Sequence, residues 1–374
     1  MKRNLSQKKQ NPIKTFQNTN RQKIIHIKKN PQREFLKNMI VFLNIIISVI
    51  CAVATDKPKI ENAVIMILCQ NKDMAEISRT IEKFELKFNH RYHYPYVFLN
   101  DKLFTKKFEN EIKSKVSSNV EFGVLNKDEW GYPEWIDQDK ARKSMKEMEA
   151  KKIIYGGSES YRHMCRFFSG KFYKNELVKK YDYYWRIEPG VDFLCDIEYD
   201  PFKYLRTNNL EYGFTIAIRE FMSTIPTLWD STLEFLRENK DIIKNDNSIE
   251  MILTKDGNYN GCHFWSNFEI ASFKFYRSEI YEKYFEYLDK KGGFYYERWG
   301  DAPVHSIAAY LFLGVEKIHF FSDIGYRHDP FQHCPNIPSM ESKCDCKPSD
   351  SIDFTAFSCL PNYFGDKYSP KTYL

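Results

Sequence analysis

The sequence predicts one large α/β domain with a mostly parallel sheet, and three observations support this. Short apolar runs of strand length alternate with helical patterns after residue 60. Strands that alternate with helices pair in parallel, because each crossover returns the chain to the same edge of the sheet. With 374 residues, 43% of them hydrophobic, the chain is long enough to enclose such a core. A ligand is therefore expected at the carboxyl ends of the strands.

The first expected strand is the apolar run AVIMILC at 63–69, and a helix follows it as far as residue 88. In that helix Ile77, Ile81, Phe84 and Phe88 recur at three- and four-residue spacing. Further strands are expected at residues 96–99, 120–125, 183–187, 214–218, 262–265 and 317–321. Another helix is expected over 303–313, with Asp301 as its N-cap and Gly314 at its end.

The first 37 residues form a strongly basic arm, with eleven Lys or Arg and one acidic residue. The arm therefore carries +10, and because the whole chain carries +6, the remainder carries −4. A mildly acidic domain lacks the basic surface that binds phosphate backbones. Nucleic acid is therefore not an expected partner.

An apolar run at 39–54 follows the arm. Sixteen helical residues rise about 24 Å, slightly less than the roughly 30 Å hydrocarbon core. The positive charge before the run places the N-terminus in the cytoplasm. We expect a basic cytoplasmic tail (1–37), a transmembrane signal-anchor (38–55) and a short stem (56–59). A cleaved signal peptide is the alternative, because Ala52-Val53-Ala54 fits a small-x-small cleavage site.

Eight of the nine cysteines lie after the apolar run, where an oxidising compartment permits disulfides. Eight cysteines allow 105 connectivities, and the sequence selects none of them. Zinc is a less favoured alternative: His328, His333 and three cysteines fall within twenty residues, but without a standard C-x2-C pair. Residues 336–374 are expected to form an irregular Cys-containing tail.

Two acidic positions are candidate metal ligands. Asp137 and Asp139 form a literal Asp-x-Asp motif, but they precede a charged helical stretch, where the helix dipole favours acidic residues. Glu188 is better placed, because it ends the aromatic strand at 183–187 and Pro189-Gly190 then break the strand. A carboxylate there can hold a divalent metal against a diphosphate, whose charge the metal neutralises.

Seven sequence blocks carry a more specific signal. They are IIYGGSESYRHMCRF (153–167), YYWRIEPG (183–190), YGFTIAI (212–218), TIPTLW (224–229), CHFWSNFEI (262–270), GGFYYERWGDAPVHS (292–306) and IHFFSDIGYRHDPFQHCP (318–335). In order and without large gaps, they resemble the fungal α-1,2-mannosyltransferases of glycosyltransferase family 15. The resemblance implies a GT-A fold over residues 60–335, which is a Rossmann-like nucleotide-sugar transferase domain with a mixed, mostly parallel sheet.

The same resemblance implies roles for individual residues. Glu188 and His328 would bind Mn²⁺, and Glu269 would be the nucleophile or would stabilise an oxocarbenium ion. The catalytic group would also include Tyr161 and Asp301. Donor contacts are expected from Gln70, Tyr155, Tyr161 and Arg186, and acceptor contacts from Trp265, Asn267, Arg298 and Asp301. Relatives often carry arginine in place of Gln70. Two alternatives stay open: Glu269 as a buried strand acid paired with an arginine, and Asp301 as a helix cap.

The function implied by the resemblance is retaining transfer of mannose from GDP-mannose to mannose residues of O-linked or N-linked glycans on glycoproteins. The expected location is the Golgi membrane, with type II topology and a lumenal catalytic domain. The alternative is a non-catalytic glycan-binding paralogue in a Golgi mannosyltransferase complex. Because every chemical position is filled together, at residues 161, 188, 269, 301 and 328, the sequence favours an active enzyme.

Overall fold

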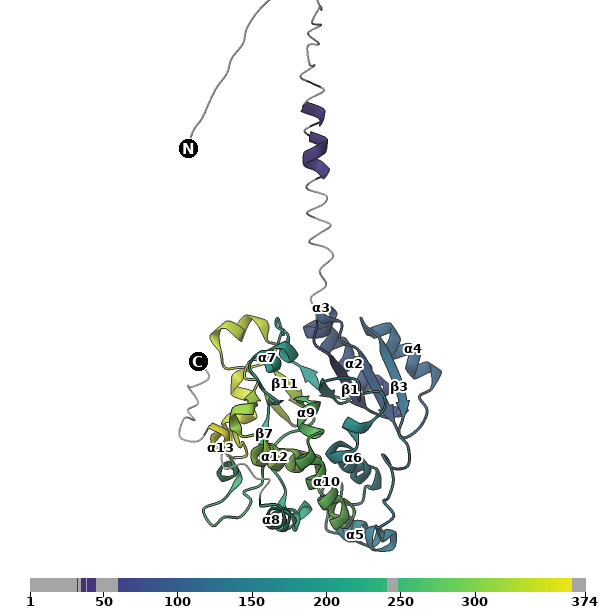
Figure 1. Cartoon of the computed structure of the whole chain (residues 1–374), viewed down its shortest axis with the longest axis vertical. Helices are drawn as coiled ribbons and strands as arrows, with labels where there is room; N and C mark the ends of the chain where they lie inside the picture. The colour runs from purple at the N-terminus through teal and green to yellow at the C-terminus, as the bar shows by residue number, and fades with distance from the viewer. Residues whose placement is uncertain (1–31, 33–34, 38, 45–59, 241–247, 365–374) are drawn as a thin grey trace, which may run out of the picture. The chain divides into compact units, whose positions relative to one another are not determined.

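The computed structural model describes residues 32, 35–37, 39–44, 60–240 and 248–364. The chain divides into two units, Met1–Lys59 and Ile60–Leu374 (Figure 1). In the first unit the described residues are helical. Among the described residues, no helix has both the length and the apolar character needed to span a bilayer. Most of the predicted anchor at 38–55, and the whole predicted stem, lie outside the described residues.

The second unit is built on a seven-stranded sheet in the order β10-β6-β9-β4-β1-β2-β3. The strands are β1 Ala63–Leu68, β2 Tyr96–Asn100, β3 Val120–Val124, β4 Tyr183–Ile187, β6 Tyr212–Phe214, β9 Glu269–Ser272 and β10 Ile318–Phe320. Neighbouring strands are parallel except at β9, which runs antiparallel to β4 and β6. The predicted α/β class and the mixed, mostly parallel sheet are therefore confirmed.

Helices cover both faces of this sheet. The main ones are α2 Met74–Phe84, α4 Lys106–Lys115, α5 Gln138–Ala150, α6 Glu159–Gly170, α7 Pro201–Thr207, α8 Leu228–Glu238, α10 Glu279–Lys291 and α12 Asp301–Phe312. Figure 1 shows α2 and α4 beside β1 and β3. It shows α6, α10 and α12 close to one another, below these elements in the view. The shorter helices are α3 His90–Tyr92, α9 Phe273–Tyr276, α11 Gly293–Tyr296 and α13 Leu360–Phe364.

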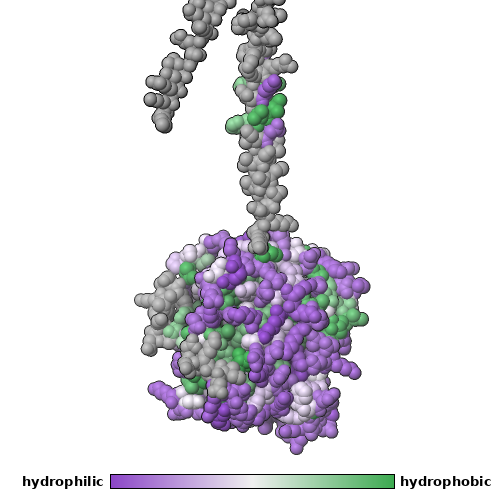
Figure 2. All heavy atoms as spheres, in the orientation of Figure 1, coloured by the Kyte–Doolittle hydropathy of each residue, from purple (hydrophilic) through white to green (hydrophobic). Residues whose placement is uncertain are grey.

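The alternation of side chains along β1 separates two hydrophobic cores. Val64 and Met66 pack with α6, α10 and α12, whereas Ile65 and Ile67 pack with α2 and α4. A strand that is buried on both faces has to be apolar throughout, which explains the continuous run that marked it in the sequence. In contrast, the outer face of this unit seen in Figure 2 is mostly hydrophilic, with smaller apolar areas.

Two predictions for local structure were wrong. The run at 214–218 forms two strands: β6 ends at Phe214, and β7 Ala217–Arg219 leaves the main sheet to pair with β8 Cys262–Phe264. The separation occurs because β8 and the C-terminal segment supply partners for β7, including Cys359 N–H donating to the Ala217 carbonyl at 2.8 Å. Asp301 does not cap α12, because the N-cap is Gly300 and Asp301 is the first helical residue.

A small sheet that the sequence did not reveal joins the segment after β4 to a hairpin near residue 330. It has the order β12-β11-β5, with β5 Asp192–Phe193, β11 Tyr326–His328 and β12 Phe331–His333. These strands have two or three residues each and mix polar with aromatic side chains, so they carry no clear two-residue periodicity. Their importance is that they bring His328 back to the segment that follows Glu188.

Three disulfides tie the C-terminal segment to the domain: Cys195–Cys344, Cys262–Cys359 and Cys334–Cys346. Cys69 and Cys165 are free and buried. The sulfur atoms of Cys195, Cys344 and Cys346 lie within 4.8 Å of one another, but all three are engaged in these disulfides. The zinc alternative is therefore wrong for these cysteines, and the segment after residue 335 is an anchored part of the structure.

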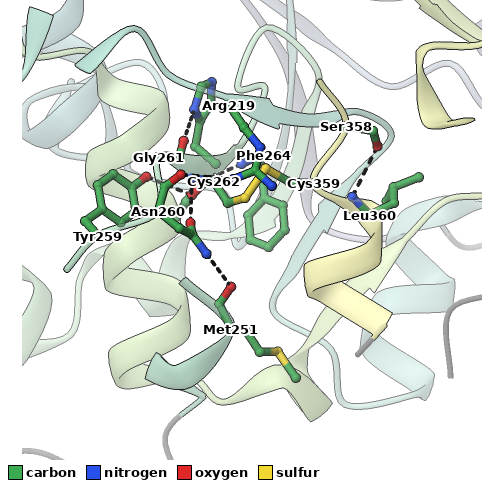
Figure 3. The surroundings of a disulfide bond; sticks show 12 residues. Arg219, Met251, Tyr259, Asn260, Gly261, Cys262, Phe264, Ser358, Cys359 and Leu360 are labelled. Atoms are coloured by element: carbon green, nitrogen blue, oxygen red, sulfur yellow. Dashed lines mark hydrogen bonds between the residues drawn. A yellow bond between two sulfur atoms is a disulfide. The ribbon is translucent and has the colours of Figure 1, made fainter. Parts of the chain in front are cut away.

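Replacing both Cys262 and Cys359 by serine should lower the free energy of unfolding by about 2–4 kcal/mol, because the bond closes a long loop. The two cysteines are separated by 97 residues, and the bond fixes the C-terminal segment against β7 and β8 (Figure 3). Urea unfolding of the double variant and of wild type measures the difference. Addition of reductant should destabilise wild type more than the double variant; equal unfolding midpoints for the two oxidised proteins would contradict the prediction.

Candidate active site

A cavity of about 300 Å³ opens at the carboxyl ends of the parallel strands. Leu68, Cys69 and Gln70 line it from the end of β1, and Asn100 and Asp101 line it after β2. This is the position that the predicted sheet topology indicated. Helix α6 and its N-cap close another side, through the polar residues Ser158 and Ser160 and the apolar Met164 and Phe168.

The walls of the cavity suit a bound anion. Lys72 contributes an ammonium group, and the N-terminus of α6 contributes the positive end of the helix dipole. Ser158 caps this helix, its hydroxyl accepting a hydrogen bond from Tyr161 N–H at 3.2 Å. A diphosphate would therefore find fixed donors and one positive side chain along one wall.

Glu188 lines the same cavity, with its side chain 24% exposed. Arg186, 3% exposed, donates one hydrogen bond to Glu188 and a second, at 2.6 Å, to the Asp301 carboxylate. Burial alone would lower the pKa of Arg186, but the carboxylates of Glu188 and Asp301 outweigh burial and raise it. The Asp301 carboxylate also accepts a hydrogen bond from Ser266 at 2.7 Å. One buried cation thus fixes both carboxylates.

His328 reaches this region from the small sheet. The antiparallel pairing of β11 with β5 sets Arg327 opposite Asp192, so His328 faces the turn that follows Glu188. The imidazole stacks on the Trp265 ring, with centroids 5.2 Å apart. Within the described residues its Nδ1 atom is buried and has no hydrogen-bond partner. A buried nitrogen without a partner is costly, and metal coordination would remove that cost. Carboxylate and imidazole together form a donor set that Mn²⁺ accepts.

Glu269 is the first residue of β9 and is fully buried. Its carboxylate accepts hydrogen bonds from three tyrosine hydroxyls, those of Tyr184, Tyr212 and Tyr276, and from His305 Nδ1 at 2.9 Å. It does not line the cavity. The alternative of a buried acid paired with an arginine is therefore half correct: the acid is buried, but its hydrogen-bonding partners are phenols and an imidazole.

His305 was not identified from the sequence, and both of its ring nitrogens contact acceptors. Nδ1 faces Glu269, and Nε2 lies 2.8 Å from the Phe168 carbonyl of α6. Only the protonated imidazole donates from both nitrogens. Burial alone would lower the pKa of His305, but the Glu269 carboxylate outweighs burial and raises it. Burial would likewise raise the pKa of Glu269, and His305 with the tyrosines lowers it instead. The pair is a buried ion pair that joins β9, α6 and α12.

The predicted donor and acceptor residues fall into two groups. Gln70, Tyr155 and Tyr161 line the cavity, and the two tyrosine rings stack with centroids 4.3 Å apart. The others are not among the residues that line the cavity. Asn267 accepts a hydrogen bond from Tyr326, and buried Arg298 pairs with Glu220 at 3.3 Å. The guanidinium of Arg298 is 5.2 Å from the centre of the Tyr161 ring. Trp265 is partly exposed beside His328.

Several residues of the site carried no recognised signal. Lys72 and Ser160 sit in ordinary polar stretches, whereas His305 could have been noticed as one histidine in an otherwise apolar helix. The literal Asp-x-Asp motif has a structural role instead, because Asp137 is the N-cap of α5 and accepts hydrogen bonds from the backbone N–H groups of Asp139 and Lys140.

Known proteins are similar to this chain in both sequence and fold. The sequence model described as "Glycolipid 2-alpha-mannosyltransferase", of glycosyltransferase family 15, matches residues 8–368. The chain is 49% identical to the O-glycoside alpha-1,2-mannosyltransferase omh1 of Schizosaccharomyces pombe, over 81% of this chain and 78% of that protein. It is 50% identical to glycolipid 2-alpha-mannosyltransferase 1 of Candida albicans, over 81% of this chain and 71% of that protein.

Two solved structures are similar over most of their length. One is core-mannan synthase A from Aspergillus fumigatus in its Mn/GDP form, with 38% identity, a TM-score of 0.78, and coverage of 82% of this chain and 88% of the other. The second is the mannosyltransferase Ktr4p from Saccharomyces cerevisiae in complex with GDP, with 39% identity, a TM-score of 0.79 and coverage of 83% of each chain. Because the family model matches nearly the whole length of the chain, this chain belongs to glycosyltransferase family 15.

Proposed function

We propose that the protein transfers mannose from GDP-mannose to a mannose-terminated glycan, forming an α-1,2 linkage. The observation that carries this proposal is the cavity at the carboxyl ends of β1, β2 and β4, which Lys72, the α6 N-terminus and Glu188 all line. The relatives are named as mannosyltransferases acting on glycolipids and O-glycosides, and the similar solved structures hold GDP. These names support a nucleotide-sugar donor and a glycan acceptor.

A divalent metal is part of the proposal, with Glu188 and His328 as its protein ligands and Mn²⁺ as the ion. The partly exposed carboxylate and the buried, unpartnered Nδ1 atom fit this role. When bound, such a metal neutralises the negative charge of the departing diphosphate. The chain's own part is to hold Glu188 in place: Arg186 orients this carboxylate, and Asp301 and the Phe168 ring, 3.5 Å away, hold Arg186.

For Glu269, the enclosed position favours electrostatic stabilisation over direct attack on the sugar. Attack requires contact with the anomeric carbon, but this carboxylate is covered by three phenols and an imidazole. A fixed negative charge below the site still stabilises positive charge that develops on the sugar in the transition state. The retained α configuration of the product belongs to the same proposal.

The proposed setting is the Golgi lumen, with the catalytic unit anchored by residues 38–55. Its support is the +10 arm that precedes the apolar run, together with three disulfides that require an oxidising compartment. The acceptor can be an O-linked or an N-linked chain, and testing the purified enzyme on both types decides between them.

Removal of the metal should abolish transfer. EDTA should stop the reaction and Mn²⁺ should restore it, and Glu188→Ala should behave like the chelated enzyme because one of its two protein ligands is missing. Asp139→Ala is the matched control: it removes an exposed acidic residue of the Asp-x-Asp motif and should leave activity unchanged. Electron paramagnetic resonance of free Mn²⁺ should show that only Glu188→Ala weakens binding. Full activity in EDTA would refute the metal assignment.

The role of Glu269 can be separated from its structural contribution by a double variant. Glu269→Gln leaves the buried His305 without its counter-charge and should cost about 3–5 kcal/mol of stability. Glu269→Gln combined with His305→Gln removes both charges and should recover part of that loss. At matched folded fraction, kcat should be about 10²- to 10³-fold below wild type in both variants, with donor KM little changed. Recovery of kcat in the double variant, or retention of more than about a tenth of wild-type kcat, would assign Glu269 a purely structural role.

The topology predicts a simple protection pattern. Protease added to sealed microsomes should shorten the protein only slightly, from the N-terminal side, because the catalytic unit lies inside. Digestion of the catalytic unit, or a mature N-terminus at Thr55, would contradict the anchor. Transfer of labelled mannose by the same membranes after detergent treatment checks that the protected unit is active.

A folded protein that binds mannose glycans but transfers no mannose would support the non-catalytic alternative.

A further inference from the structure

Five aromatic rings form a continuous row beginning at His328. Trp265 stacks on His328, Phe331 lies 5.5 Å from Trp265, Phe357 lies 5.5 Å from Phe331, and Phe221 lies 6.3 Å from Phe357, all measured between ring centroids. We call these five residues the aromatic row. They come from segments widely separated in the sequence, and one of them, Phe357, belongs to the C-terminal segment.

The aromatic row is partly exposed along its length, and Phe221 at its end is the most exposed member. Phe221 is 54% exposed and its neighbour Met222 is 45% exposed, while Trp265, His328, Phe331 and Phe357 are each partly exposed. Single exposed apolar side chains are common on proteins, but a contiguous group of large ones marks a binding surface. Phe221 belongs to neither of the two hydrophobic cores.

The surroundings hold the aromatic row rigidly. Backbone N–H of Arg219 donates to the Phe357 carbonyl at 3.3 Å, and Ile218 bridges to Ser358. The Cys262–Cys359 disulfide then fixes this segment to β8, as Figure 3 shows with Arg219, Gly261 and Ser358 around the bond. A ligand that binds preformed side chains orders few groups on binding, so less of its binding energy is lost.

Both ends of the aromatic row connect to the candidate active site. At one end, Trp265 precedes Ser266, whose hydroxyl donates to the Asp301 carboxylate. At the other end, the Phe221 N–H donates to Glu220 at 2.8 Å, and Glu220 pairs with Arg298, which lies over the cavity residue Tyr161. The row therefore borders the side of the site on which the sequence predicted acceptor contacts.

Sugar rings are the occupants that this chemistry fits. A pyranose has an apolar face of C–H groups that packs on an aromatic ring, and its hydroxyl edge binds polar groups at the margin. The row supplies flat apolar faces, and Arg219 and Glu220 flank Phe221 with polar groups. A long, rigid series of rings suits a linear chain of sugars better than one isolated sugar.

We propose that the aromatic row is a second acceptor subsite, which binds the sugars of an oligomannose acceptor beyond the mannose that receives the new residue. This inference rests on the proposed function. It assigns a role to Phe221, Phe331 and Phe357, and it explains why the C-terminal segment is fixed beside the catalytic unit.

The test compares short and long acceptors. Phe221→Ala and Phe357→Ala should each raise the KM for α-linked mannotriose about five- to tenfold, the loss expected for one stacking contact. The same variants should leave the KM and kcat for α-methyl mannoside within about twofold of wild type, since a monosaccharide does not reach Phe221 or Phe357. Phe221→Tyr, which keeps the ring, should behave like wild type. The matched control is Leu86→Ala, an exposed apolar residue outside the cavity and the row.

Three outcomes would overturn the proposal. The first is an equal loss with both acceptors, and the second is no loss with either. The third is a loss confined to octyl mannoside, which would mean that the row binds an alkyl chain. If wild type transfers no mannose to any acceptor, the proposed function fails separately. Saturation-transfer NMR of mannotriose, without donor or metal, then tests the row directly: signal that Phe221→Ala and Phe357→Ala reduce supports the subsite, and unchanged signal overturns it.

Discussion

The buried guanidinium of Arg186 is the interaction on which the site depends. It lies in β4, stacks on Phe168 of α6 and binds Asp301 at the start of α12, so one side chain joins the sheet to two helices. A buried charge is tolerated only when it is paired and hydrogen-bonded, which fixes the relative positions of these elements. The exposed side of the same network is Glu188, and its orientation toward the cavity follows from this pairing.

The charges beneath the cavity nearly cancel. Arg186 and protonated His305 carry two positive charges, while Glu188, Glu269 and Asp301 carry three negative ones. Arg186 and Glu269 are also opposite each other in the pairing of β4 with β9. One negative charge is left over, and of the three carboxylates Glu188 is the one that lines the cavity. The negative charge of Glu188 favours a cation at the open face of the site, next to the wall at which Lys72 and the α6 N-terminus favour an anion.

The sequence predicted the parts of the fold that have strong periodicity. The ends of β1, β2, β3 and β4 were predicted within a residue or two. The signal was clearest for β1 and β2, because buried parallel strands are continuous apolar runs. The short strands β5, β11 and β12 were missed, since two or three mixed residues give no pattern. Sequence motifs predicted cavity residues such as Glu188 and Tyr161, whereas the side chains that donate hydrogen bonds to Glu269 could not be predicted. Its tyrosines come from three separate elements, and only the folded sheet brings them together.

The pairing of the cysteines has a consequence for how the chain is made. Each disulfide includes at least one cysteine at or after residue 334: Cys344, Cys359, and both members of the Cys334–Cys346 bond. A growing polypeptide therefore presents Cys195 and Cys262 before their native partners have been synthesised, together with Cys69 and Cys165, which stay free. Native bonds can form only when translation is almost complete, so mispaired intermediates have to be reshuffled afterwards. Oxidative maturation of this domain should accordingly be a late event, and a chain that ends before residue 344 could form none of its native crosslinks.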